Sequence, residues 1–305
     1  MISRSETATK LLVGAGLAAA FALTLASGAS AQRRFGRDLP ITAPPQVTQK
    51  TFTLGAAPLV AVDNVTGPIT VVGDGGDAVR FTATETIAGE SQDAVAQAQR
   101  DVHLDVTQTG DSLKLYVDGP FRCGGHDATT RCDHWGRHWN NPGYQVRFDF
   151  ELHVPAGARL DLRTVNGGDV QASNVSGAYQ VHNVNGSVQL AGLAGSGEAA
   201  TVNGSVSVAF RANPQAASSF SSVNGKISLY LQPGLNADLS YHTVNGSVYS
   251  DFPVAPQPLA GAASEREGHR IVFRRGRTSS ARVGNGGPAL TLRTVNGSIY
   301  LHQVK

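Results

Sequence analysis

The stretch Thr243-Val244-Asn245-Gly246-Ser247-Val248 decides the fold of this chain, because it is repeated with little change. Near-identical copies begin at Thr201 and Thr294, and shorter Val-Asn-Gly copies end at Gly167, Gly186 and Gly225. The repeated pairs are Asn166-Gly167, Asn185-Gly186, Asn203-Gly204, Asn224-Gly225, Asn245-Gly246 and Asn296-Gly297. A unit that recurs this often predicts an architecture of stacked repeats.

The spacing of the glycines indicates the size of one repeat. When degenerate copies at Gly177 and Gly195 are included, successive glycines from Gly167 to Gly246 lie 10, 9, 9, 9, 21 and 21 residues apart. Steps of 9 or 10 fit one strand and one corner, and steps of 21 fit two. The last step, from Gly246 to Gly297, is 51 residues and therefore contains an insertion.

Asn-Gly between apolar residues ordinarily predicts a two-residue hairpin, which would give a compact antiparallel sandwich. In such a hairpin Val184 would share a face with Ser187, and Val188 would face the other way. The apolar residues instead keep constant offsets, as in Val202, Val206 and Val208. We therefore predict that the chain bends at each Asn-Gly corner without reversing.

An all-β fold follows from these bends, mostly a parallel β-solenoid (β-helix-like). We expect each corner glycine to adopt a backbone angle that other residues resist. We also expect the valines before the corner asparagines to form an inner column. The asparagine side chains would form a hydrogen-bonded ladder that fixes the register.

The N-terminal residues have the pattern of a secretion signal. Residues 1–31 combine Arg4 and Lys10 with an apolar run and a small-residue cleavage site. Residues 32–50 are predicted to be a flexible leader. The mature chain would carry 23 basic and 22 acidic residues, a net charge of +1, which gives no general attraction to nucleic acid. We expect an exported protein, in the periplasm or at the cell surface, with no transmembrane segment in the mature chain.

Residues 51–305 are predicted to form one domain with insertions at about 118–143 and 251–289. Its N-terminal part is less regular, with strands and one short helix over Ser91–Gln99, where Ser91 is the expected N-cap. A longer unit precedes several corners. Pro155-Ala156-Gly157 leads into Leu160-Asp161-Leu162, and Pro233-Gly234 leads into Ala237-Asp238-Leu239.

On this lead-in and the repeated Val-x-Gly corners, the chain resembles the adhesin-like domain of unknown function found in exported bacterial proteins. The resemblance covers about residues 51–302, apart from the two interruptions. It implies a β-solenoid at the cell envelope. No catalytic residues are established for that family, so none is transferred to this chain. The loop rich in Cys, His and Trp departs from the family pattern.

That loop offers three hypotheses. Cys123 and Cys132 are predicted to form a disulfide in an exported chain. The alternative is a metal site made with His126, His134 and His138, although the cysteine spacing fits no common zinc pattern. The aromatic residues could form a glycan platform or pack the loop onto the domain; they are Trp135, Trp139 and Tyr144.

Two further groups of charged residues each have more than one interpretation. The arginines of 270–282 could meet an anionic lipid or polysaccharide, or form a solvated strand. The carboxylates Asp161, Asp169, Asp238 and Glu198 are scattered through the repeats, whereas a glycan-active enzyme needs a pair. Asp161 and Asp238 occupy equivalent places in two lead-ins, which indicates a structural role.

The sequence therefore predicts a non-enzymatic binding or scaffold module of the cell envelope. Its partner would be an unknown envelope protein or glycan, and it would need no cofactor. Two alternatives remain open, a glycan-active β-helix enzyme and a periplasmic metal-binding sensor that uses the Cys/His loop.

Overall fold

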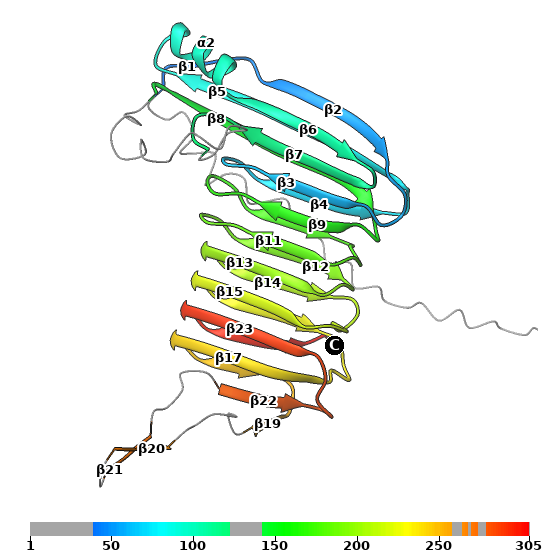
Figure 1. Cartoon of the computed structure of the whole chain (residues 1–305), viewed down its shortest axis with the longest axis vertical. Helices are drawn as coiled ribbons and strands as arrows, with labels where there is room; N and C mark the ends of the chain where they lie inside the picture. The colour runs from blue at the N-terminus through cyan, green and yellow to red at the C-terminus, as the bar shows by residue number, and fades with distance from the viewer. Residues whose placement is uncertain (1–38, 123–141, 258–263, 268–269, 274–278, 305) are drawn as a thin grey trace, which may run out of the picture.

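The computed structural model describes residues 39–122, 142–257, 264–267, 270–273 and 279–304. Within them the chain is built from two large mixed β-sheets and one helix. The all-β prediction is confirmed, but neither sheet is purely parallel. The strands are stacked along the long axis of the molecule, and the helix lies at the N-terminal end (Figure 1).

The first sheet has eleven strands, with β2 paired to β5 beside the main path. In spatial order that path is β1 (Ile41–Thr42), β5 (Ala78–Gly89), β8 (Tyr144–Pro155), β4 (Ile69–Asp74), β10 (Val170–Ser173), β12 (Val188–Leu193), β14 (Val206–Phe210), β16 (Ile227–Leu231), β24 (Ile299–Gln303) and β18 (Val248–Ser250), and β2 is Gln46–Thr53. All neighbours from β8 through β18 pair in parallel.

The second sheet also has eleven strands. Its order is β19 (Val254–Gln257), β22 (Ser279–Val283), β17 (Ala237–Asn245), β23 (Ala289–Asn296), β15 (Ser218–Asn224), β13 (Gly197–Asn203), β11 (Tyr179–His182), β9 (Arg159–Arg163), β3 (Leu59–Asp63), β7 (Ser112–Asp118) and β6 (His103–Thr109). The neighbours from β17 to β7 pair in parallel. A separate antiparallel pair joins β20 (Ser264–Glu267) to β21 (Arg270–Phe273).

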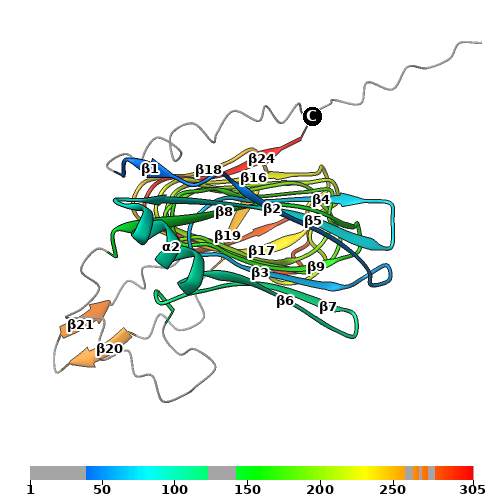
Figure 2. The ribbon, with the colours of Figure 1, turned by 90° about the horizontal axis from the view of Figure 1, so that it is seen from above.

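The core lies between the two sheets. Viewed along the stack, the turns superpose as flattened loops, with β4 and β16 on one long side and β3 and β9 on the other (Figure 2). Alternate residues of each strand point inward and stack in register. In the first sheet one buried column is Ile69, Val170, Val188, Val206, Ile227 and Ile299. In the second sheet another is Leu162, Val181, Ala199, Phe220 and Leu292.

Each repeated corner carries the chain from one sheet to the other. The corner at Asn203-Gly204, for example, follows β13 of the second sheet and precedes β14 of the first. The hairpin interpretation of Asn-Gly is therefore wrong in the repeats, because the flanking strands do not pair with each other.

The prediction that the corner valines point inward is also wrong. Val202 and Val223 are 38% and 40% exposed, whereas Thr201 and Ser222, one residue earlier, are each 4% exposed. The reason is the need to satisfy backbone groups inside the corner. Thr201 Oγ1 donates to the Gly186 carbonyl oxygen at 2.7 Å, and Ser222 Oγ donates to that of Gly204 at 2.8 Å. A valine could not supply this donor.

The corner glycines are required for a different reason from the one we predicted. Of the six glycines in the Asn-Gly pairs, only Gly167 has a left-handed backbone, with a φ of +74°. At Gly225 an added Cβ would overlap the carbonyl oxygen of Gly204 in the neighbouring corner, and at Gly297 it would overlap that of Gly225. Close stacking of successive corners therefore excludes a side chain at these positions.

Both ends of the stack contain a pair of strands inserted out of chain order. β23 lies between β15 and β17, and β24 lies between β16 and β18. Figure 1 shows the last repeat, in red, within the stack and not at its end. Near the other end, β3 lies between β7 and β9, and β4 lies between β8 and β10.

The N-terminal part differs from the prediction at two points. Ile41–Thr42, predicted to be flexible, forms β1 and pairs antiparallel with β5. Residues 46–50, predicted to be flexible, belong to β2, which pairs antiparallel along β5 from Gln46 to Thr53. Its threonines, Thr48, Thr51 and Thr53, suit an exposed strand. The helix α2 spans Gln92–Asp101, and Ser91 Oγ caps it by accepting from the Ala94 N–H at 3.1 Å. The helix buries Val95 and Ala98.

Candidate functional site

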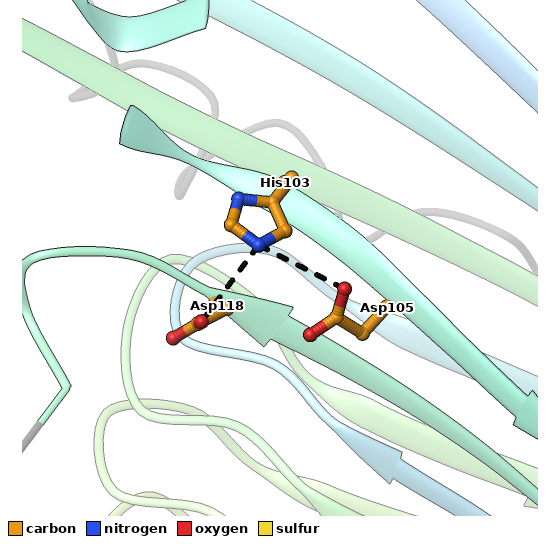
Figure 3. Close-up of side chains that lie close together, drawn as sticks. All are labelled: His103, Asp105 and Asp118. Carbon is orange, nitrogen blue, oxygen red and sulfur yellow. Dashed lines mark ion pairs between the residues drawn. The ribbon is translucent and has the colours of Figure 1, made fainter. Parts of the chain in front are cut away.

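One cluster of metal-ligating side chains lies on the β6–β7 hairpin. His103, Asp105 and Asp118 each offer one donor atom, and these atoms all lie within 4.8 Å of one another. Figure 3 shows the imidazole of His103 pointing toward both carboxylates. His103 Nε2 is 3.8 Å from Asp105 Oδ1 and 3.7 Å from Asp118 Oδ2.

Strand geometry brings these residues together. His103 and Asp105 are two positions apart on β6, so they share one face of the sheet. Asp118 of β7 lies directly opposite His103 in the antiparallel register. The alternate positions on β7 are the buried Leu113, Leu115 and Val117, which fix the cluster on the outer face.

The carboxylate of Asp118 is held in place by the backbone. Its Oδ1 accepts a hydrogen bond from the Gly119 N–H at 2.8 Å, which leaves Oδ2 facing His103. The Asp118 side chain is 23% exposed and that of His103 is 57% exposed, so the cluster is open to solvent on one side. An open group with one nitrogen and two oxygen donors can hold a cation.

The residues beside the cluster are already paired with one another. Arg122 donates to Asp63 Oδ1 at 2.8 Å, and its guanidinium lies over the Tyr116 ring at 4.5 Å. Burial raises the pKa of Tyr116 above its ordinary value; Arg122 opposes this shift, while Asp118, Asp63 and Asp105 add to it. Asp63 is therefore neutralised by an arginine and is not part of the cluster.

A second candidate surface follows the corners along one side of the stack. The asparagine amides form a continuous chain of hydrogen bonds of 2.7–2.8 Å in the spatial order Asn166, Asn185, Asn203, Asn224, Asn296 and Asn245. Beside them lie exposed valines of five corners, which we call the valine edge: Val165, Val202, Val223, Val295 and Val244. Val184, in the layer between Val165 and Val202, is only partly exposed.

A third feature is a group of aromatic rings on the outer face of the first sheet. Tyr230 stacks on His302 with ring centroids 4.9 Å apart, and Tyr249 stacks on Tyr300 at 5.0 Å. Tyr300 and His302 lie 5.8 Å apart on β24 and join the two pairs. The sequence analysis did not single out this group, because the residues come from β16, β18 and β24.

Most residues of the predicted loop lie outside the described part of the chain. They are Cys123, His126, Cys132, His134, Trp135, His138 and Trp139. Tyr144 is described and is 6% exposed, so it does not belong to an open aromatic platform. Its hydroxyl donates to Asp101 Oδ2 at 3.2 Å, and burial, followed by the charge of Asp101, raises the pKa of Tyr144 to about 12.

Two of the four carboxylates considered for an enzyme pair with arginine, and Asp169 accepts a hydrogen bond from the Ser187 N–H at 2.7 Å. Asp161 accepts from Arg163 Nε at 3.0 Å, and Asp238 accepts from Arg282 Nε at 2.7 Å. The bond from Arg282 lowers the pKa of Asp238. Both contacts agree with a structural role for these residues. The other arginine side chains of the 270–282 group lie outside the described residues.

The cluster on the hairpin was missed by the sequence analysis, although a signal for it exists. His103-Leu104-Asp105 alternates outward and inward, and Gly110-Asp111 marks the hairpin turn. Asp118 then lies as far after that turn as His103 lies before it. This counting requires the exact register of the turn, which the sequence pattern alone leaves free.

In the described part of the chain no helix is long and apolar enough to cross a membrane. No protein-family model and no curated protein matches the sequence.

Several solved structures are similar in shape. One is a candidate cell adhesion protein from Clostridium sporogenes, with 9% identity and a TM-score of 0.41, over 86% of this chain and 100% of that chain. A candidate adhesin from Bacteroides fragilis has 11% identity and a TM-score of 0.37, over 85% and 97% of the two chains. A candidate lipid-binding protein from Parabacteroides distasonis has 11% identity and a TM-score of 0.24, over 86% and 98%. Similarity this low carries no argument about function.

Proposed function

We propose that this protein is an exported, non-enzymatic binding or scaffold module of the cell envelope, built as a parallel β-solenoid. The valine edge is the observation that carries the proposal. Its five valines are 37–51% exposed although they belong to the most regular part of the fold. Contiguous exposed apolar side chains are typical of interaction sites, whereas isolated ones need no explanation.

The parallel pairing supports the solenoid part of the proposal. Corners of similar sequence recur along the stack, so this edge presents the same groups repeatedly. The asparagine ladder beside the valines adds amide donors and acceptors at each layer. An elongated partner, either an envelope protein or a glycan, could contact several layers at once. The export part rests on the sequence pattern of residues 1–31.

The binding free energy that the valine edge could contribute can be estimated from the exposure of its side chains. Complete burial of a valine side chain contributes about 1.5–3 kcal/mol. At roughly 40% exposure, covering each valine would add about 0.6–1.2 kcal/mol, or about 3–6 kcal/mol for the edge. Losing three consecutive valines would thus weaken binding by at least about tenfold.

Capture of envelope components tests the proposal. The immobilised mature protein is compared with the triple variant Val202→Thr/Val223→Thr/Val295→Thr, which changes three successive layers. The matched control is Val47→Thr/Val254→Thr, because these valines are exposed at 57% and 42% but lie outside the valine edge. We expect capture to fall for the triple variant and to persist for the control.

A further variant lacking residues 119–143 tests recognition by the insertion. If this deletion abolishes capture while the triple variant retains it, the valine edge is not the binding surface. N-terminal sequencing of the protein from a periplasmic or surface fraction tests export. A mature chain that still begins at Met1 would contradict the signal-peptide assignment.

A further inference from the structure

We propose that His103, Asp105 and Asp118 bind one divalent transition-metal ion of the Zn²⁺ type on the outer face of the β6–β7 hairpin. The proposal is independent of the valine edge and of the Cys/His loop. It begins with a distance. An N–H···O hydrogen bond spans 2.7–3.2 Å, whereas His103 Nε2 lies 3.8 and 3.7 Å from the two carboxylate oxygens.

These separations are too long for direct hydrogen bonds but close to those of ligands that share one ion. Zn²⁺ binds imidazole nitrogen and carboxylate oxygen at about 2.0–2.2 Å. Two ligands at about 2.1 Å from one ion, separated by 109–120°, are therefore roughly 3.4–3.6 Å apart. The observed distances exceed this range by a few tenths of an ångström, which side-chain rotation can close.

The charges around the cluster support the same conclusion. Several surface carboxylates of this protein are paired with arginine, as Asp63 is with Arg122 at 2.8 Å and Asp238 with Arg282 at 2.7 Å. Among the described residues no lysine or arginine forms an ion pair with Asp105 or Asp118. Two carboxylates thus converge on one imidazole without a permanent cation between them. A bound divalent ion would supply that charge.

The donor set narrows the choice of ion. Ca²⁺ and Mg²⁺ prefer sites made only of oxygen ligands. Imidazole suits Zn²⁺ and its first-row neighbours, and carboxylates are also accepted by these ions. The Gly119 N–H bond to Asp118 Oδ1 orients one carboxylate, as outer partners commonly do at metal sites.

The position of the site has a structural consequence. β6 is the last strand of the second sheet and pairs only with β7 among the described strands. An ion held by His103 and Asp105 of β6 together with Asp118 of β7 would link this edge strand to the rest of the sheet. Three protein ligands leave at least one coordination position open to solvent.

Calorimetric titration of ZnCl₂ into the intact mature protein tests the proposal, with Co²⁺ absorption as a second readout of ligand geometry. His103→Asn and Asp118→Asn should each weaken binding at this site by at least about tenfold. Both side chains are on the surface, so circular dichroism should show unchanged folding. The matched control is His153→Asn, because His153 is 53% exposed and lies 4.0 Å from Asp74, which Arg80 already pairs.

The Cys/His loop requires its own control, because it could bind metal separately. Metal binding by the loop is removed in a variant that has serine at Cys123 and Cys132 and glutamine at His126, His134 and His138. Binding that survives in this variant and in His153→Asn, but weakens in His103→Asn and Asp118→Asn, supports the site. The proposal is overturned if wild-type protein binds no Zn²⁺. It is equally overturned if binding disappears only with the loop variant, or if millimolar Mg²⁺ or Ca²⁺ displaces the ion.

Discussion

Replacement of Thr201 by valine tests how successive corners are held together. Thr201 is 4% exposed, and its Oγ1 donates to the Gly186 carbonyl oxygen at 2.7 Å. Valine has nearly the same shape, so the change removes the donor without opening a cavity. A buried carbonyl left without its partner costs about 1–3 kcal/mol. We therefore expect Thr201→Val to lower the free energy of unfolding by that amount.

The neighbouring substitution Val202→Thr is the matched control. Val202 is 38% exposed, so its replacement should change stability by no more than about 0.5 kcal/mol. Comparison of the two variants is decisive, because an inward-pointing valine, as expected from sequence alone, predicts that Val202→Thr is the more destabilising change. On that view Val202→Thr would bury an unpaired hydroxyl, and Thr201→Val would be harmless.

Urea unfolding and thermal unfolding, each followed by circular dichroism, measure both variants. For a unit of about 250 residues, 1 kcal/mol corresponds to a shift of roughly 2 °C in the melting temperature. Thr201→Val should therefore melt about 2–6 °C below the wild type. Our account of the corner is refuted if Thr201→Val matches the wild type while Val202→Thr loses more than about 1 kcal/mol.

Three further predictions concern corner stacking, a buried tyrosine and the order of the layers. Gly225→Ala should cost about 1–3 kcal/mol in urea unfolding, because its Cβ would overlap a carbonyl oxygen of the adjacent corner. The pKa of Tyr144 rises from 10.0 to about 12 on folding. The contribution of Tyr144 to stability is therefore complete below pH 10 and is lost as the pH rises toward 12. Tyr144→Phe should make the free energy of unfolding less dependent on pH between 10 and 12. Cysteines replacing Asn224 and Asn296 should form a disulfide, because these residues are register partners in adjacent strands. Cysteines replacing Asn224 and Asn245 should not form one, because the strand of Asn296 lies between them.

Each of these predictions has a specific contrary result. Gly75→Ala is the control for the glycine substitution, because an added Cβ there would meet no atom within 4 Å; equal effects of the two would contradict the steric argument. An unchanged pH dependence in Tyr144→Phe would show that other groups titrate in that range. Peptide mapping that finds the Asn224/Asn245 crosslink and no Asn224/Asn296 crosslink would contradict the inserted last repeat.

The spacing of apolar residues was sufficient for much of the strand pattern. Val206, Val208 and Leu229 point inward as expected, because alternation along a strand is a local property. Ser91 likewise begins the helix through a local hydrogen bond to the Ala94 N–H. These features depend on residues close together in sequence, so the sequence alone predicts them.

The corners show where local pattern was insufficient. A threonine and a valine in succession could each face the core, and hydrophobicity favours the valine. The choice depends on a carbonyl of another corner, such as that of Gly186, 15 residues before Thr201, which needs a donor. The need for glycine at Gly225 similarly depends on Gly204 in the neighbouring corner.

The sequence by itself determined that this protein is all-β, that it is built from repeated corners, and where its helix begins. The tertiary structure decided which side of each corner is buried, that the last repeat is inserted within the stack, and that His103, Asp105 and Asp118 meet. The physical reason is that backbone satisfaction, strand order and register are set by residues far apart in the chain. Apolar periodicity contains no information about which distant strand becomes a neighbour.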